Sequence, residues 1–201
     1  MKVHILYEVV LGPWGGANQF LKALRQELMS KNIYVNNAND ASVLLVNLNP
    51  AAIPAMIKDV MRMKNISQNK IVIARLDGPI SQVRGKGKEI DRLFFRFIKI
   101  ITDGVIYQSE WSRKSNRELG NDFKGFSKII PNAPDPTIFN TVNRTCFATD
   151  RKIRIIANSW SNNKRKGFPV YQWLDTHLDF SKYEMVFIGN SPLTFKNIQC
   201  L

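Results

Sequence analysis

The chain has 201 residues, of which 44% are hydrophobic and 22% charged, so it can bury a real core in one or two soluble domains. Its formal charge of +13 favours a phosphorylated or polyanionic partner or an anionic membrane surface, the alternative being a surface that is merely basic. No apolar run approaches the roughly 18 residues of a membrane span, and no signal peptide or metal-like cysteine spacing is visible, which predicts a cytoplasmic protein without a metal site.

Strand-like and helix-like patterns alternate from the first residues onward. The sequence predicts strands at residues 2–10, 42–48, 70–79, 104–109 and 127–132, and helices at 15–31, 50–64, 90–101 and 110–119. A strand after each helix implies parallel pairing through right-handed crossovers. We therefore expect an α/β fold with a doubly wound, Rossmann-like parallel sheet. Its loops 11–16, 77–88, 108–112 and 131–137 should meet at the carboxyl edge of the strands, where such sheets bind ligands.

The alternation of strands and helices breaks near residue 131 and then restarts. Three prolines and several Asn, Thr and Asp residues between 131 and 152 indicate an irregular connection. Beyond it, a strand at 153–158, a helix at 168–178 and a strand at 183–190 begin a second α/β unit that is too small to stand alone. The predicted organisation is a domain at 1–140, a linker at 141–151 and an incomplete unit at 152–201.

Glycines and charged residues mark the predicted carboxyl edge of the first domain. Gly15 and Gly16 lie between the first strand and the first helix, where glycine permits close backbone approach and a helix start offers N–H donors to an anion. Arg75 and Asp77 end the third strand. An arginine there can hold phosphate, and a carboxylate can bind a hydroxyl or act as a base. The structural alternatives are a tight turn at the glycines and an Asp-Gly turn after the strand.

The helix at 90–101 has the most regular apolar spacing of the chain. A core-facing helix with a solvated basic side is the first interpretation. Peripheral contact of the basic residues 84–99 with an anionic membrane is the alternative, because Phe95 falls on the charged face. The predicted core residues are Ile90, Leu93, Phe94, Phe97, Ile98 and Ile101, and the cations are Arg84, Lys86, Lys88, Arg92, Arg96 and Lys99.

Two further loops precede predicted helices. Ser109 is the predicted N-cap of the helix at 110–119, with Ser112 as the alternative, and Ser109 is thereby a candidate for the same ligand-binding edge. Lys164, Arg165 and Lys166 lie before the helix at 168–178. Cations and backbone N–H groups at a helix start suit a phosphate or diphosphate, and an exposed basic loop is the alternative.

Five stretches resemble, in order, the landmarks of retaining GT-B glycosyltransferases, in particular glycosyltransferase family 4. The family's glycine-rich loop after its first strand is similar to GPWGGANQF, and its D-x-(hydrophobic)-x-x-S pattern is similar to DGVIYQSEWSRKS. The segment that closes the family's first domain resembles IIPNAPDPTIFN. The strand and KG turn that open its second domain resemble IIANSWSNNKRKGF, and the next strand resembles YEMVFIGNSP. Together these stretches cover nearly the whole chain.

The resemblance implies two Rossmann-like domains that face each other across a cleft. A nucleotide-sugar donor would bind mainly to the second domain, and a glycan, lipid or other acceptor mainly to the first, with no cofactor or metal required. The resemblance also implies that Lys166 of the KG turn contacts the donor diphosphate, and that Gly15 and Gly16 approach the donor phosphates and sugar.

Three features depart from the family pattern. Ser161 stands where an arginine normally precedes the lysine, so Arg165 or Lys164 would substitute for it. Asp77 lies near the position of a family histidine, which makes it a candidate for an acceptor or sugar contact and only a weak candidate for a catalytic residue. The family's glutamate pair lies further along than Leu201. We therefore expect a truncated portion of a hexosyl-transferring enzyme with little activity alone.

Two other functions stay open at the level of the sequence. A basic α/β protein that binds nucleic acid would explain the charge, but no RRM, KH or helix-turn-helix signature is present, so nucleic acid is not favoured. The other alternative is a non-catalytic chain that binds a sugar nucleotide or pairs with another subunit.

Overall fold

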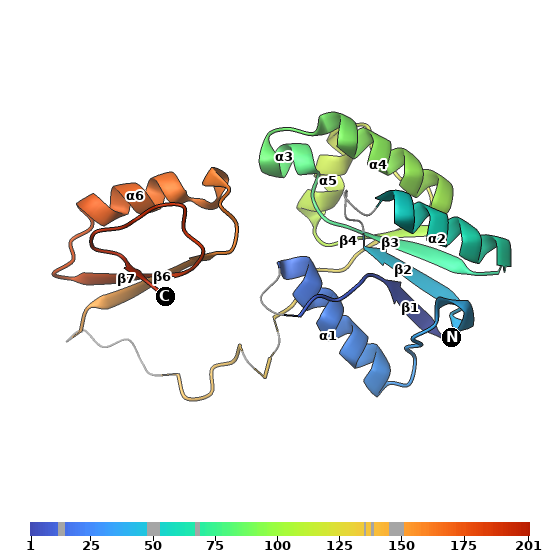
Figure 1. The fold of residues 1–201 in the computed structure, drawn as a ribbon, viewed down its shortest axis with the longest axis horizontal. Coiled ribbons are helices and arrows are strands. Elements are labelled where there is room, and N and C mark those ends of the chain that lie inside the picture. Colours follow the sequence, from blue (N-terminus) through green and yellow to red (C-terminus); the bar gives the residue numbers. More distant parts are fainter. Residues whose placement is uncertain (12–14, 48–52, 67–68, 135, 138, 145–150) are drawn as a thin grey trace. The chain divides into compact units, whose positions relative to one another are not determined.

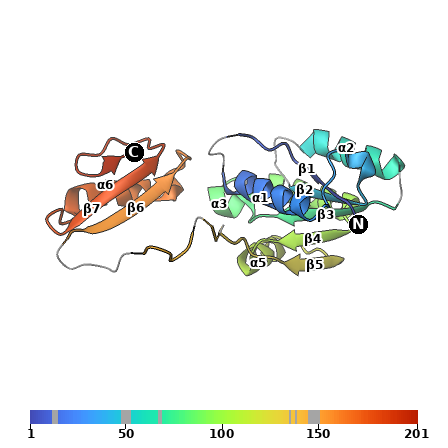
Figure 2. The same cartoon turned by 90° about the horizontal axis from the view of Figure 1, so that it is seen from below.

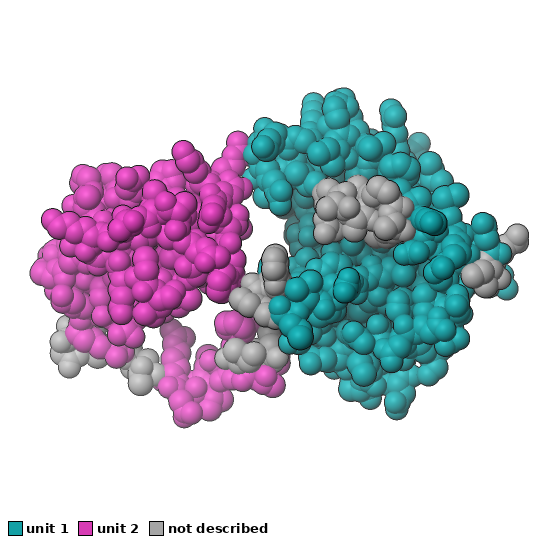
Figure 3. Space-filling model, viewed as in Figure 1, with its two compact units in different colours: residues 1–133 teal, residues 134–201 magenta. Residues whose placement is uncertain are grey.

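The computed structural model describes the chain except residues 12–14, 48–52, 67–68, 135, 138 and 145–150, and except the side chains of residues 53–56, 64 and 66. The chain forms two compact units, residues 1–133 (unit 1) and 134–201 (unit 2), which Figure 3 colours separately. The predicted linker, residues 141–151, falls before the first strand of unit 2, which begins at Ile153. None of the described helices is long and apolar enough to cross a membrane.

Unit 1 is built on five parallel strands in the order β1-β2-β3-β4-β5, which confirms the predicted parallel sheet. The strands are β1 (Val3–Leu6), β2 (Val43–Asn47), β3 (Ile71–Leu76), β4 (Gly104–Tyr107) and β5 (Phe126–Ile129). The helices are α1 (Gly16–Ser30), α2 (Ile53–Ile66), α3 (Ile80–Arg84), α4 (Lys88–Ile101) and α5 (Glu110–Glu118), with a short 3-10 helix η1 (Ala38–Asp40). The sequence analysis missed α3, which lies inside the predicted loop 77–88.

The winding of the sheet reverses at β1. Helix α1 leads to a segment that pairs with β1 through a single parallel bridge between Val3 and Tyr34. The Val3 N–H donates to the Ile33 carbonyl at 2.9 Å, and the Val35 N–H donates to the Val3 carbonyl at 3.0 Å. Because a strand has only two edges, β2 lies on the other side of β1. Helix α1 accordingly covers one face of the sheet and helices α2 and α4 cover the other (Figures 1 and 2), so the sheet is doubly wound.

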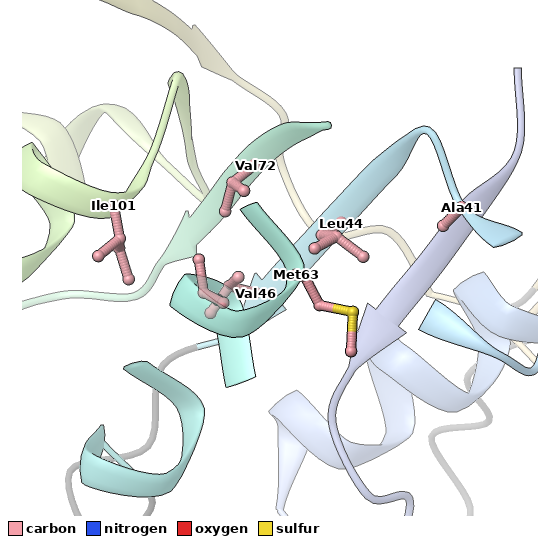
Figure 4. Packing of buried hydrophobic residues seen from close by; sticks show 7 residues of the cluster. Ala41, Leu44, Val46, Met63, Val72 and Ile101 are labelled. Carbon is pink, nitrogen blue, oxygen red and sulfur yellow. The ribbon is translucent and has the colours of Figure 1, made fainter. Parts of the chain in front are cut away.

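The two faces of the sheet have separate cores. Since successive side chains of a strand point to opposite faces, Val72 and Ala74 of β3 pack on the side of α2 and α4, and Arg75 lies on the side of α1. A fully buried Val or Leu side chain stabilises the fold by roughly 1.5–3 kcal/mol, which makes a register slip costly. The cluster under α2 comprises Ala41, Leu44, Val46, Val60, Met63, Val72 and Ile101 (Figure 4), and that under α1 comprises Ile5, Leu21 and Leu45.

Helix α4 buries Ile98 and Ile101 as the sequence predicts, but it exposes the predicted core residues Ile90 and Leu93. Phe95 is 2% exposed, whereas Leu93, predicted to be in the core, is 51% exposed. The cause lies at buried Asp91, whose carboxylate accepts hydrogen bonds from the Ile80 and Ser81 N–H groups at 2.8 and 2.9 Å and so caps helix α3. Residues four apart are neighbours on one face of a helix, so Phe95 lies on the same side of α4 as Asp91. Phe95 lies beside the cations of α4, with the Lys99 ammonium 5.3 Å from its ring centroid, but it is buried, so the predicted exposed aromatic is wrong.

Unit 2 has three parallel strands rather than the predicted two. Strands β6 (Ile153–Ser159) and β7 (Tyr183–Gly189) pair with each other, and β8 (Gln199–Cys200) adds to the far edge of β7. Helix α6 (Phe168–His177) packs on one face through Phe168, which is buried against Met185 and Phe187. A short 3-10 helix, η3 (Lys164–Lys166), precedes α6. A two-residue strand leaves no periodic signal in a sequence, which explains why β8 was missed.

Candidate functional site

A cluster of polar side chains from four strands lies at the carboxyl edge of unit 1. Arg75 is at its centre: its Nη1 donates to Asn47 Oδ1 at 2.9 Å and to Asp77 Oδ1 at 2.6 Å. Its Nη2 donates to Gln108 Oε1 at 3.1 Å and to Asn132 Oδ1 at 2.9 Å. The side chains following β2, β3, β4 and β5 therefore meet at one edge, as the predicted convergence of loops 77–88, 108–112 and 131–137 requires.

The terminal nitrogens of the Arg75 guanidinium are both hydrogen-bonded within this cluster. Its side chain is 3% exposed, and each terminal nitrogen already donates to two protein acceptors. The ring of Phe20 from α1 lies over the guanidinium, with 4.3 Å between the guanidinium carbon and the ring centroid. Asp77, by contrast, remains 46% exposed. In the geometry shown, Arg75 positions the Asp77 carboxylate, and Asp77 is the charged group of the cluster that faces solvent.

The backbone at the end of β3 is held by helix α5. Ser109 is the N-cap of α5, as predicted, because its hydroxyl accepts a hydrogen bond from the Ser112 N–H at 3.0 Å. The Ser112 hydroxyl donates to the Leu76 carbonyl at 3.1 Å or to the Asp77 carbonyl at 2.9 Å. Ser109 thus lies at the start of α5, on the same edge of the sheet as Asp77. Its hydrogen bond with the Ser112 N–H holds the first turn of α5 in place.

The first turn of α1 lies at the same edge. Gly15 is the N-cap residue and Gly16 the first residue of α1, and a Cβ added to either would meet no atom of the described residues within 4 Å. The buried side chain of Asn18 anchors this turn, since it accepts from the Val10 N–H at 2.9 Å and donates to the Val10 carbonyl at 2.8 Å. The close approach of a ligand to Gly15 and Gly16 stays a prediction. Residues 12–14 of the predicted glycine loop lie outside the described residues.

The carboxyl edge of unit 2 forms a pocket of about 810 Å³. The chain segments after β6 and β7 approach closely there: the Asn190 N–H donates to the Ser159 carbonyl at 2.8 Å, and Gly189 has a φ of +112°. A Cβ on Gly189 would lie 2.4 Å from the Ser159 carbonyl oxygen, so only glycine fits. The lining residues are Trp160, Asn162, Gly189, Asn190, Ser191, Leu193, Thr194, Phe195, Ile198 and Cys200.

None of the three predicted phosphate-binding cations is among the residues that line this pocket; they begin two residues after the lining residue Asn162. Lys164, Arg165 and Lys166 form helix η3, which is capped by the side chain of Asn163 through the Arg165 N–H at 3.1 Å. All three side chains are exposed, and among the described residues none has an ion-pair partner. Gly167, with a φ of +94°, then turns the chain into α6.

Ser161, which stands where the sequence resemblance would place an arginine, stabilises this turn. Its N–H donates to the Ser159 hydroxyl at 3.1 Å, and the Ser159 hydroxyl donates to the Ser161 carbonyl at 2.9 Å. The hydroxyl of Ser161 accepts from the Asn163 N–H at 3.3 Å. These bonds stabilise the loop between β6 and η3 without adding a positive charge.

Sequence reasoning missed Asn47, Gln108 and Asn132. Each is an uncharged amide that stands at or just beyond the end of a parallel strand. That shared position was the available signal, since the carboxyl ends of parallel strands meet at one edge. The sequence could not show which of them would bond Arg75, because such pairing depends on side-chain direction and strand register.

The chain resembles solved structures but no protein-family model and no curated protein sequence. Anabaena Alr3699/HepE in complex with UDP matches with a TM-score of 0.59 at 14% identity, over 95% of this chain and 61% of HepE. The same protein in complex with UDP-glucose matches with a TM-score of 0.61 at 12% identity, over 100% of this chain and 68% of that chain. This chain thus spans between 61% and 68% of the length of HepE.

At these identities the likeness shows the fold. The chain has the GT-B type of α/β architecture, with a Rossmann-like first unit followed by a smaller second α/β unit. Membership of family 4, read from the sequence motifs, stays a prediction. Within the described ranges, no three His, Cys, Asp or Glu side chains gather as a metal site would require.

Proposed function

We propose that this chain belongs to a glycosyltransferase that transfers a hexosyl group from a nucleotide-sugar to a glycan, lipid or other acceptor. Unit 1 would supply the acceptor side and unit 2 the beginning of the donor side. The observation that carries this proposal is the GT-B architecture shared with HepE, a protein solved with UDP and with UDP-glucose. Retention of configuration and a metal-free reaction follow from the family 4 resemblance and are part of the same proposal.

The pocket of unit 2 supports the donor assignment. Its volume of about 810 Å³ lies within the range of roughly 300–1,000 Å³ typical of small-molecule sites. Trp160 offers an aromatic surface to a base or sugar, and Asn162 and Asn190 offer amide groups to ribose or sugar hydroxyls. We assign the donor diphosphate to Lys166, with Arg165 and Lys164 as neighbouring cations that add positive potential.

The carboxyl edge of unit 1 supports the acceptor assignment. Asp77 presents a half-exposed carboxylate that is oriented by Arg75, which is the arrangement a sugar hydroxyl needs for a charge-assisted hydrogen bond. Ser109 lies at the adjoining helix start. Gly15 and Gly16 leave open space beside the same edge, where we assign the approach of the donor.

A lipid acceptor would place the chain at a membrane surface. Helix α4 exposes Leu93 and Ile100 next in sequence to the cations Arg92 and Lys99. We therefore propose peripheral contact of residues 84–99 with the anionic cytoplasmic surface of a membrane. Phe95 does not take part, because it is buried.

Isothermal titration of the chain with UDP, UDP-glucose and other nucleotide-sugars tests the proposal. We expect binding that Lys166→Ala weakens by roughly 10-fold or more, the value of one lost charge-assisted contact. Lys182→Ala is the matched control, since Lys182 is an exposed lysine of the same unit that precedes β7 at the amino end of the strands. The proposal fails if no nucleotide-sugar binds while oligonucleotides bind tightly with a steep salt dependence.

A further inference from the structure

Unit 1 has a basic pocket on the side of α4 that faces the end of α5. A pocket of about 210 Å³ is lined by Arg92, Phe95, Arg96 and Lys99 of α4 and by residues 119–121 of the turn after α5. This turn leads into β5, so the pocket lies toward the amino ends of the strands, at the opposite edge from Asp77. Its volume equals about seven liquid waters at ~30 Å³ each, enough for a phosphate group.

The charged side chains that line the pocket are all positive. Arg92, Arg96 and Lys99 are four and three residues apart, so they share one face of α4. No acidic side chain is among the described lining residues. Arg92 pairs with Glu89 at 2.8 Å, but both side chains are largely exposed, which makes the pair weak and easily exchanged. Like charges at this spacing destabilise a helix unless an anion balances them.

The wall of the pocket contains a polar group without a partner. Asn121 is 5% exposed, and its Nδ2 is buried with no hydrogen-bond acceptor among the described residues, although its backbone N–H donates to the Asn116 carbonyl at 2.9 Å. A buried donor that lacks an acceptor costs roughly 1–3 kcal/mol. Native proteins contain few such groups, and a bound ion is one of the recognised reasons for them. Three cations and an unpaired amide donor in one pocket are the chemistry of an anion site.

We propose that this pocket binds a phosphate group through Arg92, Arg96, Lys99 and Asn121. The two guanidinium groups can each donate two parallel hydrogen bonds to phosphate oxygens, and Lys99 adds a point charge. The group is either that of a soluble phosphate or that of a lipid headgroup. The exposed Leu93 and Ile100 stand next to Arg92 and Lys99 in the chain and would enter the lipid surface in the second case. The site does not depend on the glycosyltransferase function.

The test titrates ¹⁵N-labelled chain with inorganic phosphate at constant ionic strength, against chloride as the reference anion. We expect shifts in the Asn121 side-chain amide and in the backbone amides of residues 119–121, and at least a 10-fold weaker response in the double variant R96Q/K99Q. The matched control is K22Q/K58Q, which removes the same charge from exposed lysines of α1 and α2. A second arm measures co-sedimentation with phosphatidylglycerol vesicles and with phosphatidylcholine vesicles.

The two arms separate the sources of the phosphate group. A soluble-phosphate response that is lost in R96Q/K99Q and kept in K22Q/K58Q supports a free phosphate ligand. Sedimentation with phosphatidylglycerol vesicles alone, lost in the same variant, supports a lipid headgroup. If the two double variants behave alike in both arms, or if neither arm gives a response above that of chloride and phosphatidylcholine, the pocket is not a phosphate site. Circular dichroism of both variants verifies that they are folded.

Discussion

Replacing Arg75 by methionine tests the cluster at the carboxyl edge of unit 1. The substitution keeps an apolar stem in contact with Phe20 but removes every donor of the guanidinium. Of the groups that lose a hydrogen bond, Asn47 is buried at 5% exposure, while Asp77, Gln108 and Asn132 can regain water because they are half-buried or exposed. The stability cost therefore rests mainly on the buried amide oxygen of Asn47.

The magnitude follows from three contributions. A buried acceptor left unpaired costs roughly 1–3 kcal/mol, and the lost stacking of the guanidinium on Phe20 costs roughly 0.5–2 kcal/mol. Relief from burying a charged group offsets part of this, so the net loss should be about 2–3 kcal/mol for unit 1. At a slope of about 2 kcal/mol per molar urea, the unfolding midpoint should fall by about 1–1.5 M.

A double-mutant cycle with Asn47→Leu isolates the buried bond. Urea unfolding is followed by far-UV circular dichroism and by the fluorescence of Trp111 in unit 1. The double variant R75M/N47L leaves no unpaired amide, so its loss should be smaller than the sum of the two single losses by about 1 kcal/mol or more. A loss below 0.5 kcal/mol for Arg75→Met, or additive single losses, would refute the reasoning.

Four further substitutions test single residues of the two units. Lys70→Met should cost unit 1 about 2–3 kcal/mol in urea unfolding, because the buried Lys70 ammonium donates to the Ala38, Asn39 and Ala41 carbonyls at 3.2, 2.8 and 2.6 Å; the exposed Lys22→Met should cost nothing measurable. Gly189→Ala should destabilise unit 2 by about 2 kcal/mol or more, through its positive φ and its overlap with the Ser159 carbonyl. Gly16→Ala, which meets no atom, should leave melting unchanged yet weaken nucleotide-sugar binding; unaltered binding would contradict its assignment. For Asp175, burial disfavours the charged form, but hydrogen bonds from the N–H groups of residues 196–198 outweigh it and lower the pKa of the carboxyl below its usual 3.8. Because the pKa is lower in the folded state, this stabilisation is present above about pH 4 and is lost as pH falls further. In Asp175→Asn, the melting temperature of unit 2 should therefore fall less steeply as the pH drops below about 4. An unchanged dependence of the melting temperature on pH would exclude Asp175 as the source of this acid sensitivity.

The sequence predicted the parts of the fold that depend on local pattern. The β1, β2 and β3 runs are apolar and bounded by turn residues, so they could be predicted as strands, and the helices between them predicted parallel pairing. The N-cap at Ser109 could also be predicted, because a serine directly before a helix commonly accepts a hydrogen bond from an N–H group of the first turn. The burial of Asp91 was not predicted, since its carboxylate accepts hydrogen bonds from two N–H groups of α3, a contact that leaves no local pattern in the sequence.

The location of the candidate site could be predicted from the sequence, but the hydrogen-bond partners within it could not. The carboxyl edge was identified from strand order, and Asp77 and Arg75 were identified as residues at a strand end. The amide partners of Arg75 were missed, because neutral Asn and Gln residues at strand ends give no distinctive pattern in a sequence. The cations at 164–166 were equally visible as a charge run, and only their resemblance to a KG turn separates Lys166 from its two neighbours.

The polar cluster has a consequence for the order in which unit 1 assembles. Arg75 joins partners that are 28, 33 and 57 residues away in the chain, on β2, after β4 and after β5. Contacts of such long sequence separation close late in folding, because each long loop must first lose its freedom. A slip of one residue in any of these strands would also turn the partner's side chain to the other face. The Asp77 carboxylate is therefore fixed only when all four strands are paired in register, and ligand binding at this edge would report that the sheet is complete.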